Sequence, residues 1–194
     1  MAGCRQVTFD MDWGKIPVYL IHRDMTPMTE TLTGNFGKYA KRYAEYERND
    51  RLGQQAKLFD NWYVLKGSHL WDPGYLGKYD PTGYLKNTAK ILAKPLNPLI
   101  RFYLLKAGQE LKPHVDFKTK CCINFVYQRQ FSGITVEGVT YPYGRFLLDN
   151  TKMHGVPPCT IDRFIVSFSF GERYEIVEEI LRKNGILKRS STTV

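Results

Sequence analysis

Two histidines and one aspartate have the spacing that most strongly suggests chemistry. The triplet His114-Val115-Asp116 places an imidazole and a carboxylate two positions apart, and in a strand such side chains face the same way. Non-haem Fe(II) oxygenases need two histidines and one carboxylate on one face of the metal, with the remaining positions open for co-substrate and oxygen. His154, 40 positions after His114, completes this set if a neighbouring strand returns it. We therefore predict that His114, Asp116 and His154 are metal ligands and catalytic residues.

A cationic residue follows these candidates at the start of a strand-like run, residues 163–170. Alternation puts Arg163 and Ser167 on one face and four apolar side chains on the other, which should pack against helices. A guanidinium that points into the protein interior is costly unless an anion meets it. The carboxylate of 2-oxoglutarate would satisfy Arg163, with Ser167 as a second donor. A structural ion pair between Arg163 and Asp149 is the alternative.

Each piece of this pattern also has a simpler explanation. An H-x-D triplet arises often by chance, and a lone loop histidine is usually structural. Asp149 and Asn150, just before His154, most simply shape a turn through side-chain to backbone hydrogen bonds, with a role in orienting His154 as the alternative. The ordered combination of H-x-D, a second histidine and then an arginine, on strands of matching parity, predicts a functional site.

The elements that must position these residues are mostly short strands. We predict strands over residues 100–105, 111–117, 122–127, 145–149 and 163–170, and a hairpin over 134–141 that turns at Glu137-Gly138. A helix capped by Asp80 should run to Pro95, and a last one should span residues 172–183. Strands spaced by about ten residues indicate an antiparallel sandwich or barrel. The fold class is therefore α+β with a jelly-roll core.

We expect one domain over residues 1–194. Residues 1–97 read as helices and loops packed on the barrel, with one helix near 35–48 and a loop-rich stretch over 66–78. The jelly-roll catalytic core spans 98–170, and the C-terminal helix lies within 171–187. Loops around such barrels commonly carry substrate contacts, so the N-terminal part is expected to frame the site.

Composition narrows the class of protein. Hydrophobic residues make up 43% of the 194 residues, which excludes a mainly disordered chain, and no apolar run is long enough for a membrane helix. The four cysteines form no C-x-x-C pair, so neither a disulfide framework nor a cysteine zinc site is expected. No signal peptide is evident, which favours the cytoplasm. The net charge of +9 favours anionic partners, among which nucleic acid is possible but not preferred.

Three segments resemble a known family. They are residues 108–116, the string Leu147-Leu148-Asp149-Asn150-Thr151 with the following His154, and Asp162-Arg163. Together they are similar to the aspartyl/asparaginyl β-hydroxylase family of Fe(II)/2-oxoglutarate-dependent dioxygenases. The resemblance implies a double-stranded β-helix (cupin-like) fold, iron bound by the two histidines and Asp116, and 2-oxoglutarate held by Arg163.

The sequence departs from this family at one strand. Family members carry an Arg-x-His-x-Pro-like segment that helps to hold the co-substrate, whereas this chain reads Lys120-Cys121-Cys122-Ile123-Asn124. Asn124 is the candidate replacement as a hydrogen-bond donor. The implied reaction is hydroxylation of an amino acid or a protein side chain with O2 and release of succinate and CO2. The alternatives are a nucleobase or nucleic-acid oxygenase of the same chemistry and a non-catalytic jelly-roll interaction module.

Overall fold

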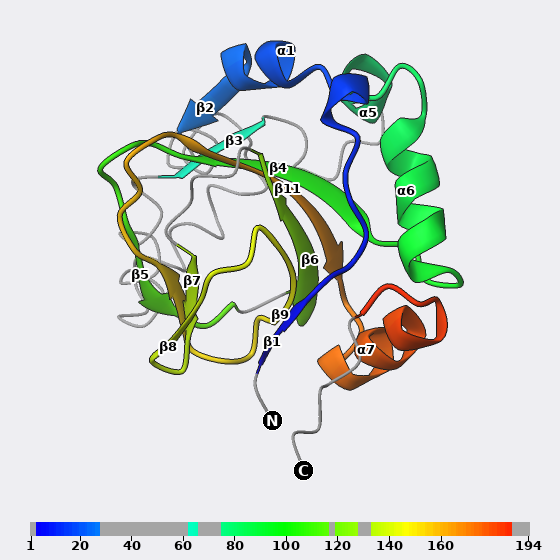
Figure 1. Cartoon of the computed structure of the whole chain (residues 1–194). Coiled ribbons are helices and arrows are strands. Elements are labelled where there is room, and N and C mark those ends of the chain that lie inside the picture. The colour runs from blue at the N-terminus through cyan, green and yellow to red at the C-terminus, as the bar shows by residue number, and fades with distance from the viewer. Residues whose placement is uncertain (1–2, 28–61, 66–74, 117–118, 128–132, 188–194) are drawn as a thin grey trace, which may run out of the picture.

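Two antiparallel sheets face each other, and helices cover the outer side of the larger one (Figure 1). The computed structural model describes residues 3–27, 62–65, 75–116, 119–127 and 133–187. The larger sheet has seven strands in the order β1-β9-β6-β11-β4-β3-β2, and the smaller has four in the order β5-β10-β7-β8. This arrangement is a jelly-roll, cupin-like core, as the sequence predicts.

The larger sheet is built around its longest strand. This strand, β11 (Arg163–Phe170), pairs with β4 (Leu99–Leu105) on one side and β6 (Cys121–Val126) on the other. Beyond these lie β9 (Arg145–Asp149), β1 (Cys4–Gln6), β3 (Trp62–Leu65) and β2 (Met25–Pro27). All eight residues of β11 are buried, because one face meets the smaller sheet and the other meets helices.

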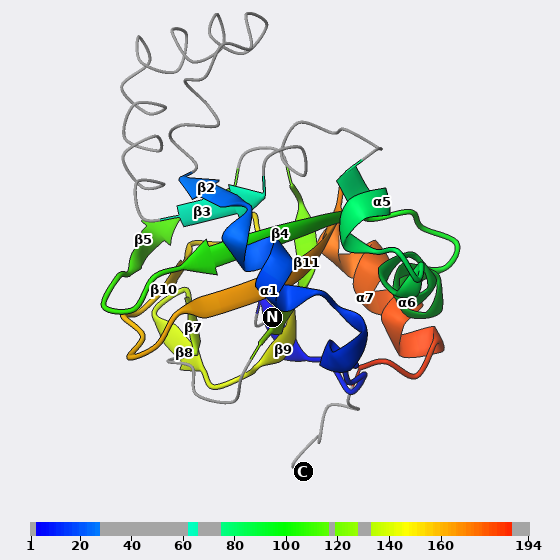
Figure 2. The same cartoon turned by 90° about the horizontal axis from the view of Figure 1, so that it is seen from above.

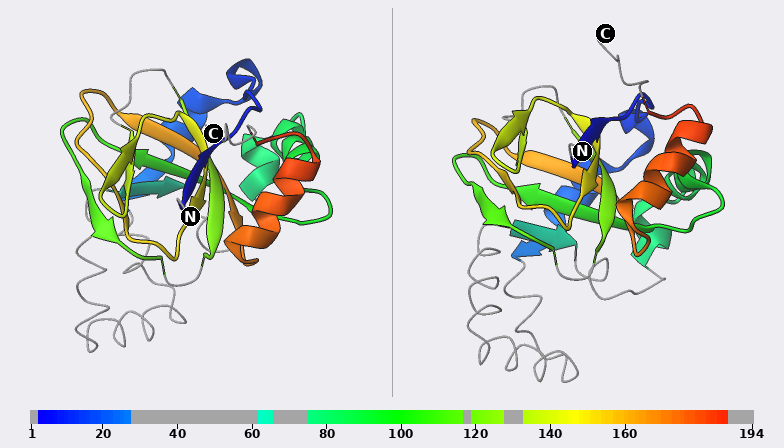
Figure 3. Two further views of the ribbon diagram at one scale, coloured as in Figure 1. Left: turned by 60° about the horizontal axis from the view of Figure 1, so that its bottom comes forward. Right: turned by 90° about the horizontal axis from the view of Figure 1, so that it is seen from below.

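The smaller sheet contains β5 (Leu111–His114), β10 (His154–Val156), β7 (Ile134–Val136) and β8 (Val139–Tyr141). The β7–β8 hairpin turns at Glu137 (φ 50°) and Gly138 (φ 81°), as predicted, and two positive φ values are what a two-residue hairpin turn needs. Figure 3 shows this sheet on the side of the molecule away from the C-terminal helix.

The main helices pack against the outer face of the large sheet (Figure 2). They are α6 (Tyr84–Ala93) and α7 (Tyr174–Lys183), while α1 (Val18–Arg23), α5 (Tyr75–Tyr79) and a short 3-10 helix (Trp13–Lys15) lie nearby. The Asp80 carboxylate accepts hydrogen bonds from the backbone N–H groups of Leu85 and Lys86, so it does satisfy the first turn of α6. The helix itself begins later than predicted, at Tyr84, and Gly83 rather than Asp80 occupies the N-cap position. Among the described residues, no helix has both the length and the apolar character to cross a membrane.

Two apolar clusters confirm the predicted alternation along β11. Phe164, Val166, Phe168 and Phe170 belong to the cluster that includes Leu92 of α6 and Leu181 of α7. Ile165 belongs to the second cluster, which lies between the two sheets and includes Val136 and Val156. Arg163 and Ser167 share the inner face with Ile165 because side chains alternate along a strand.

Some sequence-based expectations need correction. Residues 1–97 are not helices and loops throughout, because β1, β2 and β3 extend the large sheet at both of its edges. The strand predicted over 111–117 ends at His114, and the loop-rich stretch over 66–78 ends in α5. Strand β10 was not predicted as such. The helix expected near 35–48 lies outside the described residues.

Candidate metal centre

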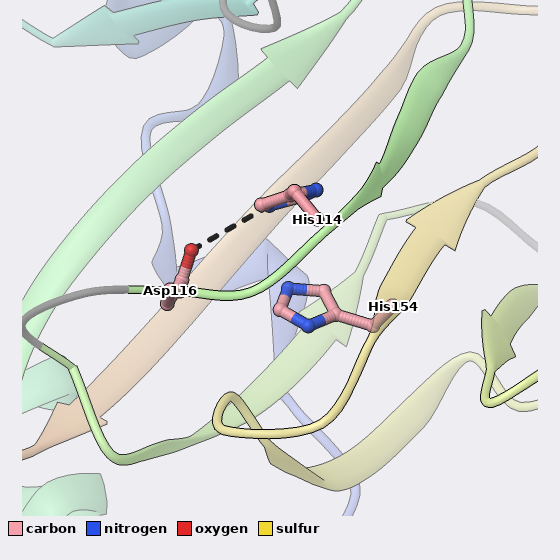
Figure 4. Close-up of side chains that lie close together, drawn as sticks. All are labelled: His114, Asp116 and His154. Atoms are coloured by element: carbon pink, nitrogen blue, oxygen red, sulfur yellow. Dashed lines mark ion pairs between the residues drawn. The ribbon is translucent and has the colours of Figure 1, made fainter. Parts of the chain in front are cut away.

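The three predicted ligands converge on one point. One ligand atom from each of His114, Asp116 and His154 lies within 4.8 Å of the others. Both histidines are about 95% buried, and Asp116 is partly exposed. Figure 4 shows the two imidazoles and the carboxylate approaching one another from β5, the segment after it, and β10. Two imidazoles and one carboxylate form the donor set of the facial triad.

The two histidines meet because β5 and β10 are antiparallel neighbours. His154 is the direct partner of His114 in this pair, and their ring centroids are 4.4 Å apart. Gly155, next to His154, lies so close to β5 that an added Cβ would be 2.8 Å from the carbonyl oxygen of Leu111. The absence of a side chain at Gly155 therefore permits the close approach that brings the histidines together.

Backbone carbonyl groups orient both imidazoles in the same way. Nδ1 of His114 lies 2.9 Å from the oxygen of Lys112, and Nδ1 of His154 lies 2.8 Å from the oxygen of Lys152. A carbonyl only accepts, so each Nδ1 donates its N–H, and in the neutral imidazole each Nε2 then presents a lone pair. Metal-binding histidines are typically held by such bonds, which fix the tautomer and the ring orientation.

Electrostatics favour the metal-binding form of His154. Burial lowers the pKa of His154 below its ordinary value, and the neighbouring His114 lowers it further. A lowered pKa keeps the imidazole neutral, and a neutral imidazole is the form that binds a metal.

Asn150 orients Asp116, which was not anticipated from the sequence. Its Nδ2 donates a 2.6 Å hydrogen bond to Oδ2 of Asp116, and its backbone oxygen accepts from the Asp116 N–H at 2.9 Å. Asp116 lies beyond the end of β5, so these bonds, rather than strand alternation, place its carboxylate beside His114. Asp149 shapes the turn as expected, because its Oδ1 accepts from the N–H and hydroxyl of Thr151.

Asn124 and Ser167 lie side by side on the inner face of the large sheet. They are direct partners in the β6–β11 pair. The Asn124 amide donates to Sγ of Cys122 at 3.2 Å, and the Cys122 thiol donates to Oδ1 of Asn150 at 3.3 Å. Ser167 Oγ lies 3.4 Å from the hydroxyl of Ser169. Asn124 is thus linked to the metal centre through Cys122 and Asn150, and its role as a co-substrate donor stays a prediction.

Arg163 is a buried cation with unsatisfied donors. It is only 2% exposed, and Nη1 donates to the carbonyl oxygen of Gly133. Its Nε and Nη2 have no hydrogen-bond partner among the described residues, and the carboxylate of Asp149 is committed to Thr151 instead. Burial lowers the pKa of Arg163, although Cys159 acts in the opposite direction. Unsatisfied N–H groups on a buried guanidinium fit a bound carboxylate well.

Asp162 fixes the start of the strand that carries Arg163. Its carboxylate accepts from the Ala107 N–H at 2.9 Å and from Nζ of Lys106 at 3.0 Å, and it lies 3.4 Å from Nε2 of His22. These contacts tie the segment before β11 to the end of β4 and to α1.

Comparisons with known proteins give distant structural similarity. The chain matches no protein-family model, and no curated protein matches its sequence. It is similar to a 2OG-Fe(II) oxygenase family oxidoreductase from Burkholderia pseudomallei, with 14% identity and a TM-score of 0.35 over 56% of this chain and 68% of that one. For a prolyl-4-hydroxylase from Pseudomonas putida the identity is 20% and the TM-score 0.30, over 37% of this chain and 46% of the other.

An RmlC-like cupin from Shewanella frigidimarina is also similar, with 19% identity and a TM-score of 0.29 over 37% of this chain and 64% of the other. The chain thus spans less than two thirds of both the cupin and the Pseudomonas protein. Identity and TM-score are low in all three cases.

Proposed function

We propose that this chain is an Fe(II)- and 2-oxoglutarate-dependent dioxygenase that hydroxylates an amino acid or a protein side chain. The resemblance to the aspartyl/asparaginyl β-hydroxylase family belongs to the same proposal, as do a small-molecule or peptide substrate and a cytoplasmic location. The observation that carries it is the convergence of His114, Asp116 and His154 within 4.8 Å in a jelly-roll core.

The donor set fits Fe(II). Two neutral imidazoles and one carboxylate leave half of an octahedron open, which suits Fe(II) with a chelating co-substrate. The four buried cysteines contribute no ligand to this cluster, so it lacks the thiolates of a structural zinc site. Arg163 adds a buried cation with two unsatisfied nitrogens, which suits the distal carboxylate of 2-oxoglutarate.

Iron, when bound, supplies oxidative chemistry: one C–H bond, one O2 and one 2-oxoglutarate yield an alcohol, succinate and CO2. The residues of this chain hold the metal and the co-substrate in position. His114 and His154 present fixed Nε2 lone pairs, Asn150 holds the Asp116 carboxylate, and Arg163 binds the co-substrate. The apolar cluster between the sheets keeps water from this part of the core.

The proposal is tested with purified protein, anaerobic Fe(II) and 2-oxoglutarate. We expect a weak metal-to-ligand charge-transfer band in the visible range and, after oxygen is admitted, formation of succinate. Asp116→Ala and His114→Ala should abolish both signals. Glu110→Gln, at an exposed carboxylate next to β5, is the matched control and should keep both.

Circular dichroism separates loss of the site from loss of the fold. A folded wild-type protein without the band and without succinate would contradict the proposal and favour a non-catalytic jelly-roll module. Substrate-stimulated succinate formation with an oligonucleotide, lost at higher salt, would assign the same chemistry to a nucleobase instead.

A further inference from the structure

Three polar side chains connect the inner face of the large sheet to the metal centre. We call Asn124, Cys122 and Asn150 the amide–thiol link. Cys122 belongs to the apolar cluster between the two sheets, and Asn124 shares its face of β6 because side chains alternate along a strand. The Asn124 amide donates to Sγ of Cys122 at 3.2 Å, and the thiol donates to Oδ1 of Asn150 at 3.3 Å. Nδ2 of Asn150 then donates to Oδ2 of Asp116 at 2.6 Å, so the link ends at a predicted metal ligand.

Each hydrogen bond of the amide–thiol link has a defined direction. A carboxylate only accepts, so the Asn150 amide must present its NH2 group to Asp116, and its Oδ1 then faces Cys122. The Cys122 thiol can donate to that oxygen, because burial raises its pKa to about 12 and the charge of Asp116 acts in the same direction. The thiol is therefore protonated at pH 7. Sγ accepts from Asn124 on one side, and S–H donates to Asn150 on the other.

The backbone fixes the place of Asn150 but not the orientation of its side-chain amide. The Asn150 N–H donates to the Lys120 oxygen at 3.0 Å, and the Asn150 oxygen accepts from the Asp116 N–H at 2.9 Å. Neither bond distinguishes the two ends of the amide, which have nearly the same shape. A reversed amide would turn Oδ1 toward Asp116, where two acceptors would meet. The bond from the Cys122 thiol to Oδ1 favours the observed orientation.

The orientation of the Asn150 amide affects how Asp116 faces the metal site. Asn150 holds Oδ2 of Asp116, while Oδ1 lies 3.5 Å from Nε2 of His114. Asp116 lies beyond the end of β5, so strand pairing does not hold its side chain. The contact with Asn150 therefore directs the carboxylate toward the histidine ligand.

We propose that Cys122 is a positioning residue of the metal centre, whose thiol orients the Asn150 amide so that the amide holds Asp116 for the metal. This inference rests on the metal site of the proposed function. Cys122 acts through another side chain and is not itself a ligand. Its replacement should therefore weaken metal binding without abolishing it.

The preceding residue, Cys121, provides a matched control. Cys121 is fully buried and Cys122 is 5% exposed, so each replacement by alanine removes one buried sulfur atom. The two side chains lie on opposite faces of β6. Cys121 belongs to the cluster on the helix side of the sheet, and its thiol donates to the carbonyl oxygen of Glu172 at 3.5 Å. Loss of buried volume is common to both variants, whereas loss of the bond to Asn150 is specific to Cys122→Ala.

The test measures Co(II) binding, because Co(II) accepts imidazole and carboxylate ligands and its visible absorption bands report their geometry. Purified wild-type and variant proteins are titrated, and the Kd is obtained from absorption and calorimetry. Cys122→Ala should raise the Kd at least about fivefold, the order of one hydrogen bond, because metal binding must then select the amide orientation. It should also shift the Co(II) bands. Cys121→Ala should leave the bands unchanged and the Kd within about twofold of wild type.

The conservative replacement tests the hydrogen bond itself. Cys122→Ser keeps a donor and an acceptor at this position, but an O–H···O bond is shorter than the 3.3 Å contact that sulfur makes. The Kd for Co(II) should therefore lie between those of wild type and Cys122→Ala. Circular dichroism and urea unfolding check that each variant is folded. A folded Cys122→Ser protein that binds Co(II) no better than Cys122→Ala would contradict the proposed role of the thiol proton.

A double-mutant cycle separates positioning from packing. In a protein that already carries Asn150→Ala, the further change Cys122→Ala should not alter the Kd for Co(II), because the side chain that it orients is gone. Independent effects would instead multiply. A wild-type Kd in folded Cys122→Ala, an equal loss of affinity in Cys121→Ala, or independent effects of Cys122→Ala and Asn150→Ala would each overturn the inference.

Succinate formation tests the proposed function separately. A wild-type protein that gives the expected Co(II) results but forms no succinate with Fe(II), O2 and 2-oxoglutarate would contradict the dioxygenase and support the role of Cys122 in a metal site. Succinate formation by wild type, with an unchanged Co(II) Kd in Cys122→Ala, would do the opposite. Absence of Co(II) binding by folded wild-type protein would overturn both.

Discussion

His114 and His154 are direct cross-strand partners whose ring centroids lie 4.4 Å apart. This pairing joins two residues that are 40 positions apart in the chain, and each ring is fixed through Nδ1 by the carbonyl oxygen two residues before it. The metal centre is therefore a property of the β5–β10 pair, and changes to that pair should change metal binding.

Replacing Gly155 should disturb the centre without touching a ligand. In Gly155→Ala, the new Cβ would lie 2.8 Å from the Leu111 oxygen, so the strands must separate. Overpacking of this kind costs about 1–3 kcal/mol of unfolding free energy. We expect weaker Fe(II) binding and a lower unfolding midpoint in urea. Gly171→Ala is the control, because a Cβ there meets nothing within 4 Å. Equal metal affinity in both variants would refute this account of Gly155.

Asn150 should be needed for metal affinity although it is not a ligand. Asn150→Ala removes the 2.6 Å hydrogen bond to Asp116 and the acceptor of the Cys122 thiol. Loss of such a supporting contact typically weakens metal binding about 10–100-fold. Fe(II) titration monitored by the charge-transfer band measures the effect, and Asn150→Asp should not rescue it, because a carboxylate cannot donate to Asp116. Asn87→Ala, on the exposed side of α6, should bind iron like wild type.

The sequence predicts the structure correctly where a local pattern decides it. The alternation over residues 163–170 predicts the two faces of β11, and Glu137-Gly138 predicts the hairpin turn. The types and spacing of His114, Asp116 and His154 also predict that these three residues lie together. Strand alternation, which was predicted to place Asp116 beside His114, is not the reason for its position. Strand β5 ends at His114, and the Asn150 side chain, 34 positions away, holds the carboxylate.

The features that could not be predicted from the sequence depend on pairing between strands that are distant in the chain. Strands β1, β2 and β3 have three or four residues each, which is too short for alternation to show. Strand β3 joins the large sheet through its pairing with β4, which in turn pairs with β11. No local feature of the chain encodes that pairing, so the sequence alone could not predict it.

Arg163 should control co-substrate binding. Removing a buried charged donor from a bound carboxylate costs at least about 2 kcal/mol, which corresponds to roughly 30-fold in affinity. Arg163→Gln should therefore raise the KM for 2-oxoglutarate in the substrate-free reaction by at least that factor. Arg163→Lys keeps the charge but not the planar pair of donors, so its KM for 2-oxoglutarate should lie between those of the wild type and Arg163→Gln. An unchanged KM in a folded Arg163→Gln protein would assign the co-substrate to another residue.

Asp162 should make stability depend on pH. Burial alone would raise its pKa, but the hydrogen bonds from the Ala107 N–H and from Lys106, with His22, lower it below its ordinary value. A carboxyl group whose pKa is lower in the folded state stabilises the fold above the unfolded-state pKa, which is about 4 for aspartate. This stabilisation is lost as the pH falls through the folded-state value.

Wild-type protein should therefore have a higher thermal midpoint than Asp162→Asn at pH 7, and the difference should shrink as the pH falls below about 4. Thermal unfolding of both proteins between pH 3 and 7 measures this difference.

Glu179→Gln, at an exposed ion pair with Lys183 on α7, is the control for a second readout and should leave the KM for 2-oxoglutarate unchanged. Because Asp162 anchors the start of β11, its variant should also raise that KM through displacement of Arg163. A stable Asp162→Asn protein with wild-type KM at pH 7 would show that Arg163 needs no such anchor.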